Sequence, residues 1–90
     1  MIAAGSRPRL ASKARLRWDA KEERWFLLYP ERGLALNRTG SAVLELCDGA
    51  RTVAEIVDAV AAGAPRAEVE RDVLAFLDEL AARGLVVSSA

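Results

Sequence analysis

Apolar and polar residues alternate in the first third of the chain. Residues 15–19, RLRWD, place Leu16 and Trp18 on one side and charged residues on the other, which predicts a half-buried strand. Residues 24–29, RWFLLY, predict a second strand, and residues 34–36, LAL, predict a third. Because only short polar turns separate these runs, we expect an antiparallel meander.

The second predicted strand carries large apolar side chains on both faces. Trp25, Leu27 and Tyr29 share one face. Phe26 and Leu28 share the other. One set can pack on the helices, while the other can cover a partner, a second copy of the chain or the N-terminal segment.

From Asn37 onward the apolar spacing becomes helical. Asn37 or Thr39 can cap a first helix, and Thr52 with Glu55 three residues later forms a capping box for a second. Pro65 suits the first turn of a third helix. The apolar stripe of this third helix consists of Val69, Val73, Phe76, Leu77 and Leu80.

The order of elements predicts an α+β fold of winged-helix type. A three-stranded antiparallel meander is followed by three helices, with room for a short C-terminal strand at residues 85–87. Residues 1–12 are small, basic and interrupted by Pro8, so we expect a flexible basic N-terminal tail. Residues 13–90 then form a single domain with one modest core.

Charge and composition narrow the possible functions. Residues 1–24 hold seven Lys or Arg against three Asp or Glu, whereas residues 25–90 hold six against ten. This asymmetry favours a polar partner or a contact between subunits. The chain has no histidine and a single cysteine, Cys47, which argues against the usual general base, an internal disulfide and a thiolate zinc cluster. We therefore expect no catalytic activity, no metal and no cofactor.

The chain also lacks the long apolar stretches of membrane proteins. No run approaches the roughly 20 residues that span a bilayer. The start, MIAAGSRPRL, has no signal-peptide apolar region. We expect a cytoplasmic protein without a membrane partner.

Three segments carry a resemblance to a known family: the strand-to-helix junction LNRTG, the run CDGARTVAEIV, and the helix VERDVLAFLDELAARGLV. With the front half of the chain, they resemble protein D of pyrroloquinoline quinone (PQQ) biosynthesis over roughly residues 7–87. The resemblance implies a non-catalytic chaperone, or RiPP recognition element, that binds the PQQ precursor peptide. It also implies that this chaperone presents the peptide to a radical S-adenosylmethionine (SAM) enzyme.

The family binds its peptide by strand addition beside the third strand, flanked by the third helix. The third strand here is short, apolar and free of Pro and Lys, so its edge is open to such pairing unless it is an ordinary central strand. The predicted peptide-binding strand consists of Gly33, Leu34, Ala35 and Leu36.

On the third helix, Leu74 lies outside the core stripe and can either line the peptide groove or pack on another helix. The groove wall predicted from its shoulder consists of Glu70, Leu74, Asp78 and Ala81. Predicted contacts with a partner are Arg32, Arg7 and Arg9.

Two other functions, and the state of assembly, stay open at this point. The protein can carry the quinone product or an intermediate, stacked on its aromatic strand residues. A winged helix can also bind DNA, but residues 65–83 hold three Arg against five Asp or Glu, and phosphates would repel such a helix. We therefore expect no nucleic-acid partner, and either a monomer or a homodimer.

Overall fold

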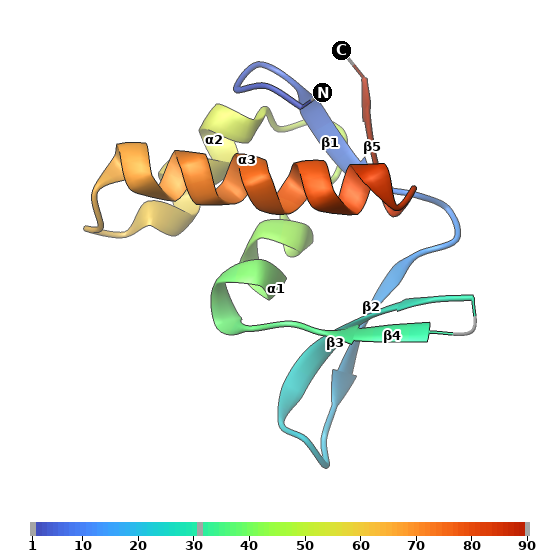
Figure 1. Cartoon of the computed structure of the whole chain (residues 1–90). Helices are drawn as coiled ribbons and strands as arrows, with labels where there is room; N and C mark the ends of the chain where they lie inside the picture. The colour runs from blue at the N-terminus through green and yellow to red at the C-terminus, as the bar shows by residue number, and fades with distance from the viewer. Residues whose placement is uncertain (1, 31, 90) are drawn as a thin grey trace.

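Strands and helices follow one another in the expected order, and the α+β, winged-helix-like arrangement is confirmed (Figure 1). The structure is a computed structural model that describes residues 2–30 and 32–89. Glu31, which the sequence places in the short polar turn before the third predicted strand, and the two end residues of the chain lie outside this part. The elements are β1 (Arg7–Leu10), β2 (Arg15–Asp19), β3 (Arg24–Tyr29), β4 (Arg32–Ala35), α1 (Arg38–Glu45), α2 (Val53–Ala61), α3 (Arg66–Ala82) and β5 (Val86–Ser89).

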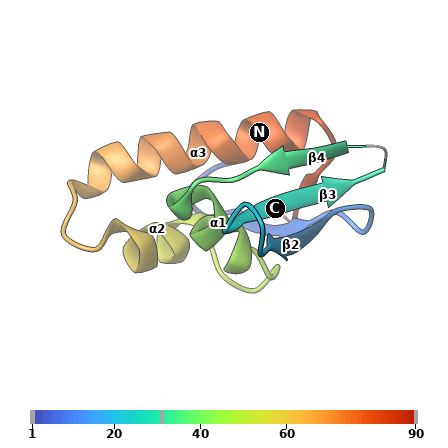
Figure 2. The ribbon, with the colours of Figure 1, turned by 90° about the horizontal axis from the view of Figure 1, so that it is seen from below.

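The meander has the strand order β2-β3-β4 and is antiparallel throughout. The predicted bounds of β2 and β3 are confirmed, whereas β4 begins at Arg32, two residues earlier than expected. The register aligns Leu16, Leu27 and Leu34 across the sheet, so these three leucines share the face that packs on the core. β4 runs alongside α3 (Figure 2).

The predicted starts of α1 and α2 are confirmed by their hydrogen bonds, whereas α3 begins at Arg66, with Pro65 as an N-cap residue that makes no side-chain hydrogen bond. The side chain of Asn37 accepts a hydrogen bond from the Gly40 N–H at 2.6 Å, which caps α1. Thr52 and Glu55 form the reciprocal capping box of α2. Caps of this kind typically stabilise a helix by about 1 kcal/mol each, because they satisfy N–H groups that have no partner within the helix.

The core lies between the sheet and the helices. Its residues come from every helix and from the inner face of the meander. The largest fully buried side chains include Leu27, Leu44, Ile56, Leu77, Leu80 and Leu85. Burial of such side chains contributes roughly 1.5–3 kcal/mol each, so this cluster dominates the stability of the domain.

The N-terminal segment is not the flexible tail that we expected over residues 1–12. β1 pairs antiparallel with β5, and Ile2 is buried with 5% of its surface exposed. The Ile2 N–H donates to Asp78 Oδ1 at 2.8 Å. The expectation is wrong for residues 2–10 because their partner strand lies at the other end of the chain, where a local pattern gives no sign of it. These residues belong to the domain.

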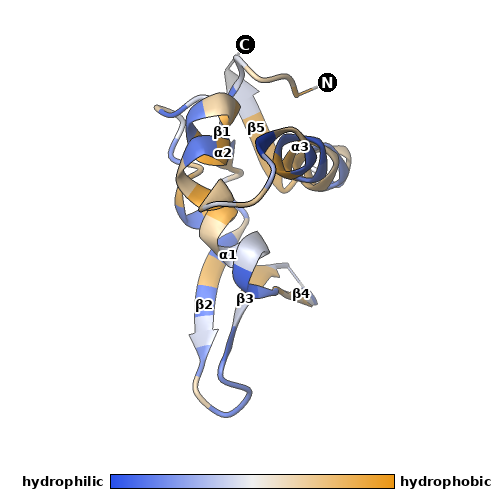
Figure 3. Cartoon of the chain, turned by 90° about the vertical axis from the view of Figure 1, so that its left-hand side faces the viewer, coloured by the Kyte–Doolittle hydropathy of each residue, from blue (hydrophilic) through white to orange (hydrophobic). Residues whose placement is uncertain are grey.

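The β2–β3 hairpin projects away from the helices (Figure 3). Phe26 and Leu28 are half-buried on its outer face, opposite the core. The N-terminal segment does not cover them, because it pairs with β5 instead. Among the described residues, no helix has the length and apolar character needed to cross a membrane.

Candidate functional site

The candidate site begins at the free edge of β4, the last strand of the meander. The Leu36 N–H donates to the Trp25 carbonyl at 2.9 Å, so these two residues form a hydrogen-bonded pair. In an antiparallel ladder such pairs alternate with pairs that exchange no hydrogen bond. Ala35, opposite Phe26, is therefore in a pair of the second kind, and its N–H and C=O point away from β3.

The same alternation applies two residues earlier. Gly33 lies opposite Leu28, again in a pair that exchanges no hydrogen bond. β4 therefore presents the main-chain donors and acceptors of Gly33 and Ala35 at its open edge. Both residues are exposed. This is the row of groups that an added strand pairs with.

A groove of about 520 Å³ separates the β4 edge from α3. Its floor is apolar, and its rim on α3 carries Asp72, Glu79 and Arg83. The apolar lining includes Leu34, Leu36, Val43, Val69, Val73 and Phe76. A groove of this size and chemistry accommodates several side chains of an extended peptide.

Gly40 sets the shape of the groove floor at the start of α1. A Cβ atom on Gly40 would lie 3.4 Å from Phe76 Cζ and 3.0 Å from Asn37 Oδ1. The second distance is at the limit of real Cβ contacts, so a side chain here would disturb the capping oxygen of α1. The absence of a side chain lets the first turn of α1 approach the Phe76 ring closely.

The rim of the groove is predominantly acidic. Arg83 Nη2 pairs with Glu79 Oε1 at 3.1 Å, and both side chains are exposed. The pair contributes little to stability because water screens it. Asp72 remains as an exposed carboxylate on the same side of α3. This charge pattern suits a peptide with basic or polar residues beside its apolar ones.

The predicted strand residues lie at this groove. Leu34, Ala35 and Leu36 line it, and Gly33 precedes them at the open edge. The structure thus brings the strand half of the predicted site together with α3.

The four residues of the predicted helix wall lie on the flank of α3 that does not line the groove. Leu74 and Ala81 pack against the hydrophobic core, and neither lines the groove. Asp78 accepts a hydrogen bond from the N-terminal segment, and Glu70 pairs with Arg66 at 3.0 Å. The N-terminal segment lies on this side of α3 at Asp78, and Arg66 links Glu70 to Asp58 of α2.

Phe76 lines the groove, although its spacing along the helix assigned it to the core stripe of α3. At about 100° per residue, Phe76 lies about 60° from Val73, toward Asp72 and away from Leu74. It counts among the apolar stripe by spacing, yet it is only half-buried. Its position next to the charged residues Asp72 and Glu79 is the signal that could have marked it as a groove residue.

The predicted partner contacts fall in two places. Arg7 and Arg9 lie exposed on β1, where Arg7 Nη1 donates to the Ala50 carbonyl. Arg32 begins β4, in the other sheet. The three arginines therefore do not form one cluster.

The described lining residues of the groove include no cysteine and no histidine. Burial, and secondarily the carboxylate of Asp48, raises the pKa of the Cys47 thiol to about 12, so this thiol stays protonated. Within residues 2–30 and 32–89, no three metal-ligating side chains are gathered at one place. Of the aromatic strand residues considered for a quinone, Trp18 and Trp25 contact each other edge to face with their ring centroids 5.7 Å apart, Tyr29 packs against the core, and Phe26 is half-buried on the outer face of the sheet.

An open strand edge, an apolar groove and a flanking helix define the class: a small winged-helix-type domain whose site suits an extended peptide rather than a reaction. The family model described as coenzyme PQQ synthesis protein D (PqqD) matches residues 24–86. The chain belongs to the PqqD family.

Relatives and solved structures agree with this assignment. The PqqA binding protein of Rhodopseudomonas palustris (strain TIE-1) is 46% identical, over 98% of this chain and 88% of the relative. The PqqA binding protein of Klebsiella pneumoniae is 45% identical over 70% of each chain. These names describe binding and no reaction, which supports the expectation of a non-catalytic protein.

Two solved structures share the fold. The solution NMR structure of the PqqD truncation of Methylobacterium extorquens PqqCD, a stand-alone recognition element for ribosomally synthesised and modified peptides (RiPPs), matches with a TM-score of 0.83 and 34% identity. The match covers 97% of this chain and 95% of that chain. TbiB1 in complex with the TbiA(beta) leader peptide matches with a TM-score of 0.75 and 27% identity, over 91% of this chain and 98% of that one.

Proposed function

We propose that this protein is a peptide chaperone that binds the PqqA precursor peptide of PQQ biosynthesis as an added strand at the β4 edge. The observation that carries the proposal is the outward-facing main chain of Gly33 and Ala35 above an apolar groove. Strand addition satisfies these groups with main-chain hydrogen bonds, and the groove selects side chains. The family assignment and the names of the relatives support PqqA as the peptide.

Successive side chains of a strand point to opposite faces, so the domain contacts only every second side chain of the bound peptide. Alternate residues of an added strand point to the same face as Leu34 and Leu36, and therefore into the groove. They pack on Phe76 and Val73 of α3. The intervening residues point to the outer face of the sheet, where they stay accessible to an enzyme. Affinity then comes from the main chain and from every second side chain.

A titration with backbone-modified peptides tests this mode directly. The wild-type chain should bind the PqqA peptide with a micromolar Kd or tighter, on the order of −8 kcal/mol. The odd-numbered and the even-numbered residues of the peptide are N-methylated in two separate peptides. One of these peptides should lose binding and the other should bind nearly as well as the unmodified peptide, because only one set of N–H groups faces β4. Equal effects in the two peptides would contradict strand addition. A scrambled peptide of the same composition controls for non-specific association.

The protein has a second proposed partner, the radical SAM enzyme of the pathway, to which it presents the bound peptide. Arg7 and Arg9 are our candidates for this contact, because they are exposed and lie on a different sheet from the groove. We propose that both encounters take place in the cytoplasm. Deletion of residues 1–12 is an unsuitable test, because it removes β1 and the buried Ile2.

Charge removal tests the enzyme contact and keeps β1 in place, at the loss of the hydrogen bond between Arg7 and the Ala50 carbonyl. Arg9→Gln combined with Arg7→Gln should weaken binding to the enzyme and leave peptide affinity unchanged, with the larger effect at low salt. An Arg38→Gln variant provides the comparison for a charge lost elsewhere on the surface. Unchanged affinity for the enzyme would remove the β1 arginines from the interface.

A further inference from the structure

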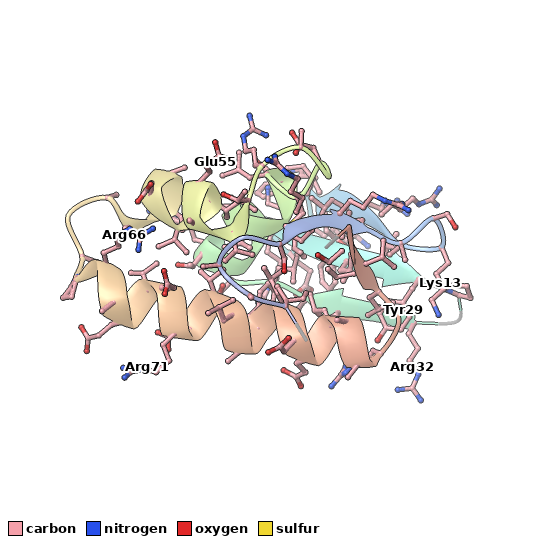
Figure 4. All side chains as sticks on the ribbon, turned by 90° about the horizontal axis from the view of Figure 1, so that it is seen from above. Lys13, Tyr29, Arg32, Glu55, Arg66 and Arg71 are labelled. Atoms are coloured by element: carbon pink, nitrogen blue, oxygen red, sulfur yellow. The ribbon has the colours of Figure 1, made fainter. Side chains whose placement is uncertain are left out.

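A second cavity, of about 490 Å³, lies where β4 begins. Three cationic side chains line it, Lys13, Arg15 and Arg32, together with Tyr29 and Ser12. No Asp or Glu is among its described lining residues. Lys13, Tyr29 and Arg32 lie at the same end of the molecule, the end at which α3 terminates (Figure 4). We call this site the basic cavity.

The cations of the basic cavity have no acidic partner within residues 2–30 and 32–89. The salt bridges there involve Arg51, Arg66 and Arg83, and none involves Lys13, Arg15 or Arg32. Three like charges around one cavity repel each other, and an anion placed between them relieves this repulsion. The hydroxyl groups of Tyr29 and Ser12 add possible hydrogen-bond donors to such an anion.

The basic cavity adjoins one end of the peptide groove. Arg32 directly precedes Gly33, the first residue of the open β4 edge. Lys13 Nζ lies 3.2 Å from the position that a Cβ of Gly84 would occupy, just beyond the end of α3. Arg83, next to Gly84, lines the groove itself. β4 therefore begins at the basic cavity, and Gly84, two residues beyond the end of α3, lies near Lys13, one of its lining residues.

A peptide in the groove meets this cavity as it leaves the β4 edge. A strand advances about 3.3 Å per residue, so a peptide paired with Ala35 and Gly33 reaches the level of Arg32 within one or two further residues. The groove rim is acidic at Asp72 and Glu79, whereas the cavity is basic. The site thus has a charge gradient along the direction of the peptide.

We propose that the basic cavity binds a carboxylate of the precursor peptide, from an Asp or Glu side chain or the peptide C-terminus, and thereby fixes the direction and register of the added strand. This inference rests on the proposed function. Main-chain pairing alone discriminates weakly between registers shifted by two residues, because the same faces stay in contact. A charged anchor at one end distinguishes these registers and the two strand directions.

A matched pair of double variants tests the anchor. Lys13→Gln/Arg32→Gln removes two charges from the cavity, and Lys21→Gln/Arg71→Gln removes the same two residue types from exposed positions away from it. Arg71 points away from the cavity in Figure 4. The cavity variant should raise the Kd for the PqqA peptide about fivefold or more at low salt, as for charged pairs that remain partly hydrated, and less at high salt. The control variant should not.

Peptide variants then identify the anchored group. Each Asp or Glu of the PqqA peptide is replaced singly by its amide, and the C-terminus is amidated in turn. One of these changes should weaken binding to the wild type but not to the cavity variant, since the interaction is already lost there. If every peptide change is additive with the cavity variant, the anchor is wrong. It is also wrong if the cavity variant matches the control, or if it affects only binding of the radical SAM enzyme.

The outcomes separate this inference from the proposed function. A wild-type chain that fails to bind the PqqA peptide overturns both. A wild type that binds, with a cavity variant that binds equally well, overturns the anchor alone.

Discussion

Replacing Ala35 by proline removes one outward-facing backbone N–H from the β4 edge. The Ala35 N–H points away from β3, so the change removes no hydrogen bond within the meander. Ala35 is exposed, and proline is tolerated on edge strands whose N–H faces solvent. We therefore expect the free energy of unfolding to change by less than about 1 kcal/mol.

The cost to peptide binding is larger than the cost to stability. The variant loses one main-chain hydrogen bond and leaves a peptide carbonyl unpaired in the interface, which together cost about 1–3 kcal/mol. A total of about 1–3 kcal/mol corresponds to a roughly 5- to 150-fold increase in Kd. Isothermal titration with the PqqA peptide measures the Kd, and a thermal melt measures the stability.

Ala35→Val is the matched control, because it adds bulk at the same exposed position and keeps the N–H. It should bind within about threefold of the wild type. Leu34→Pro marks the opposite case, because the Leu34 N–H belongs to the ladder with Leu27 and its loss should destabilise the meander. Proline and valine variants of Ala35 with equal affinity would refute the assignment of the open edge.

Three further variants probe the groove, the opposite flank of α3 and the core thiol. Phe76→Ala should raise the Kd for the peptide about tenfold in a titration, at a stability cost of roughly 1–3 kcal/mol because the ring is only half-buried; an unchanged Kd would exclude Phe76 from the interface. Leu74→Arg should instead lower Tm by roughly 10 °C with unchanged peptide affinity, since Leu74 packs on the core; weakened binding by a fully folded variant would contradict this. For Cys47, the pKa is raised by folding from about 9.0 to about 12, so the folded state binds more protons in this range and stability should fall as pH rises from about 9 toward 12. The free energy of unfolding is measured in denaturant as a function of pH for the wild type and for Cys47→Ala. It should fall more steeply with pH in the wild type, and an equal pH dependence of the two proteins would contradict this prediction.

Much of the fold follows from local patterns. Alternation located β2 and β3, and the capping residues Asn37 and Thr52 located the starts of α1 and α2. These features are local because a strand face or a helix cap depends on residues a few positions apart. The sequence left β4 as either an edge strand or a central strand, and the strand order β2-β3-β4 places it at an edge.

The remaining features depend on contacts between distant parts of the chain. β1 was missed because its partner β5 lies some 80 residues later, and Pro8 made the segment resemble a tail. The groove flank of α3 was missed for the same reason: Leu74 is covered by core that includes the N-terminal segment, while Phe76 is left half-exposed beside β4. Periodicity locates an apolar stripe on a helix, but not which of its shoulders a distant segment covers.

Backbone amide hydrogen exchange with and without the PqqA peptide tests the central claim most directly, because it reports on the main chain that the peptide is proposed to pair with. The bound state should show new protection at the amides of Gly33 and Ala35, and along residues 69–83 of α3, with the β2 edge at residues 15–19 unchanged. Protection confined to residues 15–19, with Gly33 and Ala35 exchanging as in the free protein, would contradict strand addition at β4.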